Sequence, residues 1–139
     1  MAKAARRRPM TLMVISPIAD RIHMALMTGA TAAAMGRPVT FFFSKGAVKF
    51  LSEENRTGII ASNTMPLATM DAMLDEKGIA DSALLLDGLA AMEARFIACE
   101  TAIREYDIDP ATLITRPAIE IGGLAPIIEE GEGGDWLTF

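Results

Sequence analysis

The chain contains one cysteine, Cys99, and one histidine, His23, in 139 residues. A single thiol excludes an internal disulfide, which suits a reducing cytoplasm. A single histidine gives no basis for a Ser-His-Asp arrangement. One histidine and one cysteine also fall short of the four protein ligands that a structural zinc site needs. We therefore expect no metal site, and we expect no cofactor because the chain has neither a P-loop nor a dinucleotide-binding fingerprint.

Long apolar runs are missing as well. No run approaches the roughly 18 residues that a transmembrane helix needs. The beginning of the chain has a basic start followed by an apolar stretch, but Pro17 and Asp20 interrupt that stretch early. A first strand explains it better than a signal peptide does. We expect a cytoplasmic protein that does not associate with membranes.

Basic residues are scarce in the body of the chain. The net charge is −5, and Lys3, Arg6, Arg7 and Arg8 contribute +4, which leaves −9 on the remainder. An acidic body argues against nucleic-acid binding, because that function needs a basic surface. Residues 1–9 are interpreted as a solvated basic tail.

Apolar residues are plentiful, at 51% of the chain against 22% charged residues. This composition and length predict one folded domain, over residues 10–139, with no second domain. Two apolar segments, 11–16 and 38–43, are continuous rather than alternating, which is typical of strands buried on both faces. The expected strands are 11–16, 38–43, 95–98, 118–122 and 135–139.

Helical patterns lie between these strands. Helices are expected over 20–35, from Asp81 or Ser82 to about 94, from 99 or 100 to about 106, and over 123–130. In the second helix, Asp81 and Ser82 offer N-caps, and the predicted apolar face contains Leu84, Leu85, Leu89 and Met92. Residues 52–78 form an irregular excursion in which 65–74 predicts a turn or two of amphipathic helix. The alternation predicts an α/β fold with a mainly parallel sheet and helices on both faces.

The carboxyl ends of parallel strands are where such folds bind ligands. The expected strand ends place the following residues at that rim: Ser16, Pro17, Ser44, Lys45, Gly46, Cys99, Glu100, Gly122 and Gly123. Cys99 would also lie at a helix N-terminus, where the N–H groups of Thr101 and Ala102 favour a thiolate. Lys45 would add to this effect from a neighbouring strand, whereas Glu100 would oppose it.

Each of these candidates has a plainer interpretation. Free cysteine usually behaves as a small buried hydrophobe. His23, a candidate base or hydrogen-bond donor to the sulfur, is better explained as a packed histidine or a subunit contact. The Met24–Met27 and Met70–Met73 pairs have the spacing of a Cu(I) site, but a core face or an oligomer contact needs the same spacing.

Three segments together resemble a known family. "FIACETAI", with "IHMALMTGATAAAMGRPVTFFF" before it and "IEIGGLAPIIEE" after it, resembles the DsrE/DsrF-like family, which is related to the sulfur-relay Tus proteins. Its members are sometimes labelled peroxiredoxin-like. The resemblance runs from about Met10 to the end, whereas the excursion at 52–78 and the basic tail match nothing in the family's pattern.

The resemblance implies a single three-layer α/β/α domain around a parallel five-stranded sheet, assembled as a trimer or hexamer. It also implies a persulfide carrier or sulfurtransferase that passes sulfur between partner proteins, with Cys99 in the position of the sulfur-carrying cysteine. Such a carrier needs no second thiol, because the resolving thiol belongs to the acceptor.

The residues around Cys99 also bear on two other functions. A genuine peroxidase is not expected, because no Pro-x-x-x-Thr-x-x-Cys pattern precedes Cys99 and the chain has no resolving cysteine. The alternative to a carrier is a non-catalytic oligomeric module of the same fold, in which a pocket at the rim holds a small ligand or a partner peptide. The two hypotheses differ in the reactivity and accessibility of the thiol.

Overall fold

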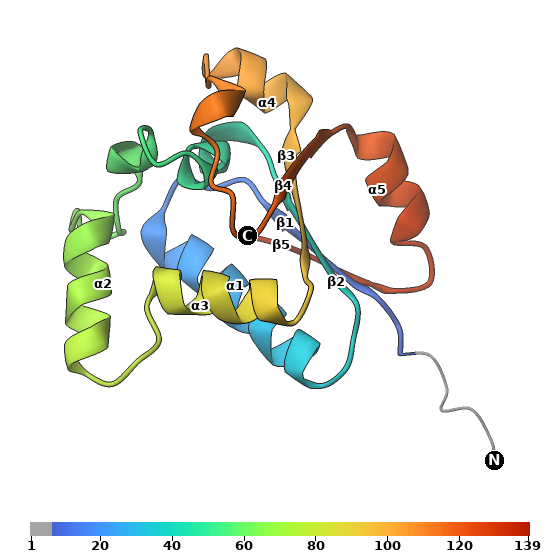
Figure 1. The fold of residues 1–139 in the computed structure, drawn as a ribbon, viewed down its shortest axis with the longest axis horizontal. Helices are drawn as coiled ribbons and strands as arrows, with labels where there is room; N and C mark the ends of the chain where they lie inside the picture. The colour runs from blue at the N-terminus through green and yellow to red at the C-terminus, as the bar shows by residue number, and fades with distance from the viewer. Residues whose placement is uncertain (1–6) are drawn as a thin grey trace.

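The computed structural model describes residues 7–139, and its chain alternates strands and helices. Figure 1 shows the strands in the middle of the molecule with helices around them. The strands are β1 (Met10–Val14), β2 (Val39–Phe43), β3 (Arg95–Cys99), β4 (Ile119–Gly122) and β5 (Asp135–Thr138). The helices are α1 (Ala19–Ala34), α2 (Leu67–Glu76), α3 (Ser82–Ala91), α4 (Glu100–Glu105) and α5 (Leu124–Glu130), and the 3₁₀ helices are η1 (Lys45–Leu51), η2 (Arg56–Gly58) and η3 (Pro110–Thr112).

The five strands form one sheet in the order β4-β3-β2-β1-β5, and every neighbouring pair is parallel. The register pairs Val14 with Phe43, Phe43 with Ala98, and Cys99 with Gly122. The carboxyl ends of β1 to β4 therefore meet at one edge of the sheet. The prediction of an α/β fold with a parallel five-stranded sheet is confirmed.

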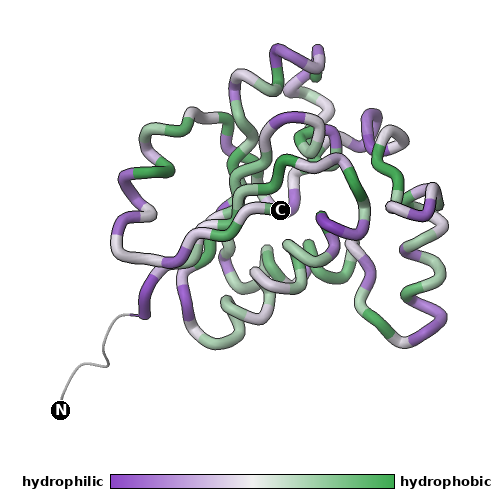
Figure 2. The backbone as a smooth tube through the Cα atoms, turned by 180° about the vertical axis from the view of Figure 1, so that it is seen from behind, coloured by the Kyte–Doolittle hydropathy of each residue, from purple (hydrophilic) through white to green (hydrophobic). Residues whose placement is uncertain are grey.

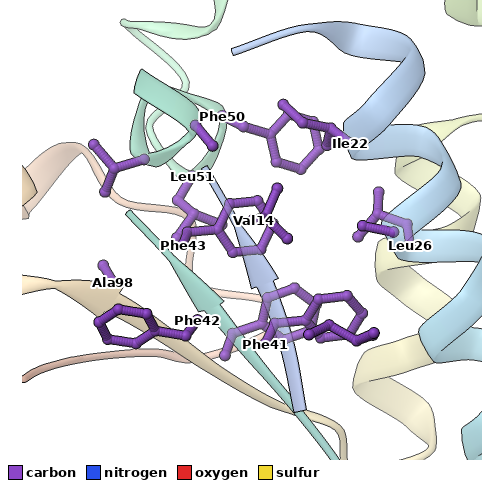
Figure 3. Packing of buried hydrophobic residues seen from close by; sticks show 14 of the residues in the cluster. Val14, Ile22, Leu26, Phe41, Phe42, Phe43, Phe50, Leu51 and Ala98 are labelled. Atoms are coloured by element: carbon purple, nitrogen blue, oxygen red, sulfur yellow. The ribbon is translucent and has the colours of Figure 1, made fainter. Parts of the chain in front are cut away.

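The main core lies between the sheet and α1. Phe41 stacks on Phe96 with 4.5 Å between the ring centroids, and Phe43 stacks on Phe50 at 5.9 Å. Figure 3 shows Ile22 and Leu26 of α1 facing these rings. Gly29 of α1 lies directly against the Phe41 and Leu12 side chains of the sheet. Such burial of large apolar side chains is the main favourable contribution to folding.

The opposite face of the sheet is covered by α5. Ile127 is the buried residue of this helix, whereas Leu124 and Ile128 are exposed. Trp136 of β5 lies close to the turn that ends α5, at Gly131. Figure 2 shows hydrophobic residues following the central strands and hydrophilic stretches at the outer turns. With α1 and α3 on the other face, the sheet has helices on both sides.

The predicted apolar face of α3 is confirmed at Leu89, which is fully buried, and at Leu85, which is partly buried against the core, but it was wrong at Leu84 and Met92. Leu84 is 61% exposed, and Met92, just beyond the end of the helix, is also exposed. The buried residues are Ser82, Leu86 and Leu89, which are spaced i, i+4 and i+7 and so share one face. The cap prediction is confirmed, because the Asp81 side chain accepts a hydrogen bond of 2.9 Å from the Leu84 N–H.

Residues 52–78 are packed onto the domain at several points. Ile60 bridges to Ile18, and the Asp20 carboxylate accepts hydrogen bonds of 2.8 Å from both N–H and Oγ of Ser62. Ile59 is fully buried. The expected turn or two of helix at 65–74 is the ten-residue α2, which begins at Leu67. The segment thus has short helices fixed to the carboxyl edge of the sheet.

Part of the predicted basic tail is attached to the body. Arg8 donates hydrogen bonds to the Gly133 carbonyl and to Asp135, and Arg37 also binds Asp135. Lys3 and Arg6 lie outside the described residues. Within 7–139, no helix has both the length and the apolar character needed to cross a membrane.

Candidate functional site

Cys99 is the last residue of β3 and the N-cap residue of α4. Its extended backbone (φ −63°, ψ 122°) ends the strand, and the helix begins at the next residue. The residue is 6% exposed, and its thiol is free. Cys99 therefore lies at the carboxyl edge of the sheet, as the sequence predicted, but it is largely covered.

The surroundings of Cys99 follow from the strand register. Cys99 pairs with Gly122 of β4, and on its other side β2 ends at Phe43 and is followed by Ser44. Ser44 has an extended backbone and is half-buried, and its N–H donates to the Val14 carbonyl. Side chains alternate along a strand, so the Cys99 side chain points to the same face as Ile97 and opposite to Ala98. That is the face covered by α5.

Two glycines, Gly122 at the end of β4 and Gly123 just after it, lie beside the end of β3. A Cβ atom on Gly123 would lie 3.4 Å from Oε1 of Glu100, and one on Gly122 would lie 3.5 Å from the Ile97 side chain. Neither position is strained, because neither glycine has a positive φ. The structure thus brings the Glu100 carboxylate next to Gly123 at the same rim as Cys99.

The first turn of α4 follows Cys99 directly. Helix geometry leaves the early N–H groups, including those of Thr101 and Ala102, without intrahelical acceptors. No side chain caps this end of the helix. Thr101 is exposed and Ala102 is buried. The helix has only six residues, so its dipole field is weak and short.

The Lys45 side chain lies at the C-terminal end of α4, not at the end where Cys99 lies. Its Nζ lies 3.2 Å from Oε2 of Glu105, the last residue of that helix. Lys45 also has a left-handed backbone, with φ of 49°. The next residue, Gly46, lies against Pro17, because a Cβ on Gly46 would be 2.9 Å from the Pro17 ring. This contact joins the loops that follow β1 and β2.

His23 does not share the face of the sheet to which the Cys99 side chain points. It projects from α1, and its Nε2 lies 2.8 Å from the Ala80 carbonyl oxygen in the loop before α3. This contact ties α1 to the segment that joins α2 and α3. Ser16 is half-buried at the end of β1, where its N–H donates to the Phe139 carbonyl at 3.3 Å.

The methionine pairs are divided between surface and interior. Met24 and Met27 are exposed on α1 and line a hollow of about 330 Å³ together with Met10 and Met35, whereas Met70 is buried. Within residues 7–139, no three His, Cys, Asp or Glu side chains are grouped to hold a metal ion.

The sequence reasoning missed one charged side chain. Arg56, in the excursion, is half-buried and stacks its guanidinium on the Phe50 ring at 4.7 Å. The contacts of this residue depend on how the segment folds back on η1, and no local pattern indicates them.

Comparison with known proteins supports the fold alone. No family model and no curated protein matches the chain. Among solved structures, the ychN protein from E. coli is similar with a TM-score of 0.64 and 15% identity, over 96% of this chain and 100% of the other. MTH1491 from Methanobacterium thermoautotrophicum, a protein of unknown function, has a TM-score of 0.63 and 12% identity over the same shares. Both similarities are consistent with a DsrE-like fold.

Proposed function

We propose that this chain is a sulfur carrier in which Cys99 holds a persulfide. The observation that supports this proposal is the placement of the thiol at the carboxyl end of β3, at the start of α4 and next to Gly122. Strand ends of this kind are where parallel α/β sheets carry function. The thiolate would attack the outer sulfur of a donor persulfide, form Cys99–S–S⁻, and release the donor as a thiolate.

The burial of Cys99 determines how such a transfer has to occur. At 6% exposure, the sulfur is sheltered from solvent and from most collisions with a partner. The helix that begins after Cys99, α4, has six residues and no side-chain cap, and a local opening of its first turn would uncover the end of β3. Local opening would expose the thiol for transfer, and closure would shield the persulfide between encounters.

The test is the reactivity of Cys99. The protein is incubated with polysulfide and examined by mass spectrometry, and alkylation by iodoacetamide is followed against pH. A carrier gains one sulfur that Cys99→Ser does not gain. Its thiol is also alkylated at a measurable rate, because transfer requires the sulfur to become accessible to a partner. A thiol that alkylates slowly at every pH and gains no sulfur contradicts the proposal.

A second candidate function is favoured by the same burial. In a non-catalytic binding module of this fold, Cys99 would be a packing residue, as most buried cysteines are. The free thiol is part of the hydrophobic core cluster together with Ala102 and Ile103. In that case Cys99→Ser lowers the free energy of unfolding, because it buries a hydroxyl among apolar groups, and ligand binding survives the substitution.

Both candidates include a homo-oligomer, a trimer or a hexamer. The support is the set of exposed methionines on and after α1, Met24, Met27 and Met35. Methionine is well suited to adaptable contacts between proteins. Light scattering on the purified chain measures the assembly state. Replacing Met24 and Met27 by glutamate is expected to dissociate the oligomer, and a monomeric mass for the unaltered chain contradicts this part of the proposal.

A further inference from the structure

The excursion before α2 contains a hollow that the proposed function does not use. It has a volume of about 290 Å³ and lies between η2 and the first turn of α2. Figure 1 shows this green segment beside the N-terminal end of α2, away from β3. Its walls are mainly apolar and include Ile59, Pro66 and Leu67. Small-molecule sites are typically concave, mostly apolar and marked by a few polar groups.

Arg56 lines this hollow, and most of the hydrogen-bond donors of its guanidinium group have no partner in the described residues. Within residues 7–139, the only hydrogen bond of this side chain runs from Nε to the Phe50 carbonyl at 2.6 Å, and no carboxylate lies within ion-pair distance of the guanidinium. Burial lowers the pKa of this guanidinium, while the charges of Glu53 and Asp71 act in the opposite direction. A charge-assisted hydrogen bond from the Nη donors of a desolvated arginine to an anion is strongly favourable in free energy.

The other arginines with side-chain partners differ from Arg56. Arg8 and Arg37 bind Asp135, Arg95 binds Glu120 and Glu130, and Arg116 binds Asp87. Each of these guanidinium groups is already paired with a carboxylate of the protein. Arg56 is instead held by its Nε hydrogen bond and by stacking on Phe50, and within residues 7–139 no carboxylate forms an ion pair with it.

One carboxylate of the protein also lines the hollow. Asp71, on α2, accepts hydrogen bonds from the Ser82 N–H at 3.0 Å and from the Ser82 hydroxyl at 2.5 Å. These bonds hold Asp71 toward α3 rather than against Arg56. Its remaining lone pairs can accept from an ammonium group. The first turn of α2, at Ala68, adds a weak positive field that would not select a ligand by itself.

We propose that this hollow binds a small carboxylate with a branched apolar body, held by Arg56 at the carboxylate and by Ile59, Pro66 and Leu67 at the apolar end. Two kinds of molecule share this chemistry. One is a simple carboxylic acid, and the other is an apolar amino acid whose ammonium group is placed at Asp71. The site is independent of Cys99, so its occupancy neither requires nor tests the sulfur-carrier proposal.

The experiment compares three probes of nearly the same shape by NMR titration of the ¹⁵N-labelled chain. They are 4-methylpentanoate, leucine and the neutral 4-methylpentanamide. We expect saturable shifts confined to residues 56–71 with a dissociation constant of about 1 mM, which is ordinary for so small a ligand. The amide should bind about tenfold more weakly or worse, because it cannot form the charge-assisted bonds. Tighter binding of leucine than of 4-methylpentanoate identifies the amino-acid source, and the reverse order identifies the simple acid.

The variants separate the site from general surface binding. Arg56→Gln should abolish saturation, whereas Arg104→Gln, an exposed arginine on α4, should leave it unchanged. If Arg56→Gln does not fold, because the Phe50 carbonyl loses its donor, Ala68→Phe takes its place. Ala68 is exposed and lines the hollow, so a larger side chain there should block the ligand without touching Arg56. The proposal is overturned if no probe saturates, if the amide binds as well as the carboxylates, or if Ala68→Phe leaves binding intact.

Discussion

Gly29 and Phe41 are packed so closely that a side chain at position 29 has no room. A Cβ atom added to Gly29 would lie 2.8 Å from Cε2 of Phe41 and 2.9 Å from Cδ1 of Leu12. Both neighbours are fully buried, and Phe41 is stacked on Phe96. The glycine therefore sets how near α1 approaches the sheet, since protein interiors are close-packed and cannot absorb extra atoms without strain.

The first prediction follows from this contact. Gly29→Ala should lower the free energy of unfolding by about 1–3 kcal/mol, the usual cost of overpacking a core. The matched control is Gly88→Ala on α3, where an added Cβ would meet nothing within 4 Å. That change should raise stability by about 0.5–1 kcal/mol, because alanine favours the helix. Urea unfolding measures both, and equal effects at the two positions would contradict the packing argument.

The second prediction concerns the left-handed backbone of Lys45. A non-glycine residue at φ of 49° carries strain of about 1–2 kcal/mol, and the exposed Lys45–Glu105 ion pair contributes at most about 1 kcal/mol. Lys45→Gly should therefore leave the stability unchanged or raise it by up to about 1 kcal/mol. Lys45→Val should lower it, since a β-branched residue fits this conformation poorly. A Lys45→Gly variant as unstable as Lys45→Val would show that the ion pair matters more than the backbone.

The strands and helices could be predicted because their signals are local. The continuous apolar runs of β1 and β2 and the Asp81 cap are visible in a few adjacent residues. The full apolar face of α3 could not be predicted in this way. Leucines at 84, 85, 86 and 89 allow more than one side of the helix to face the core. Packing against α1 selects among these sides, and that choice depends on the tertiary structure.

The third prediction is a pH dependence at Asp20. Hydrogen bonds from the Ser62 N–H and hydroxyl lower the pKa of this carboxyl in the folded state. A lowered folded-state pKa contributes stability above the unfolded value of about 3.9, and this contribution is lost as the pH falls through the folded-state value. Asp20→Asn should thus be less stable than the unaltered chain at pH 7, and the difference should shrink toward pH 3.

Urea unfolding at the two pH values checks this, with Asp75→Asn as the control. Asp75 lies in the last turn of α2, where a negative charge opposes the helix dipole. Its replacement should be neutral or stabilising at pH 7. A difference for Asp20→Asn that stays constant between pH 7 and pH 3 would show that Ser62 binds the side chain regardless of its charge.

The candidate site was only partly predictable. The place of Cys99 at a strand end followed by a helix is encoded in twelve adjacent residues, Arg95 to Tyr106, and the structure has it there. The partners of Lys45 and His23 were not predictable, because Glu105 is 60 residues away from Lys45 and Ala80 is 57 residues from His23. The burial of Cys99 and the contacts of Arg56 likewise arise from the tertiary structure, which no local pattern indicates.

The last prediction addresses the charge next to the thiol. Glu100 follows Cys99 directly, and its carboxylate lies at Gly123 on the same rim. A negative charge at this place disfavours a second one on the sulfur. Glu100→Gln should therefore raise the alkylation rate of Cys99 at neutral pH by up to about tenfold, which corresponds to about 1.4 kcal/mol. Added salt should raise the alkylation rate of the unaltered chain and reduce the difference between its rate and that of Glu100→Gln, since salt screens an exposed charge.

Glu105→Gln is the control, because it removes the same charge from the far end of α4, about 8 Å along the helix axis. It should change the rate much less than Glu100→Gln does. If neither variant reacts faster, local opening around Cys99 rather than charge limits the alkylation rate, and low concentrations of urea should then accelerate alkylation in all three proteins alike. If urea has no effect either, Cys99 is a core residue that does not become accessible, and the result favours the binding-module hypothesis over the sulfur-carrier hypothesis.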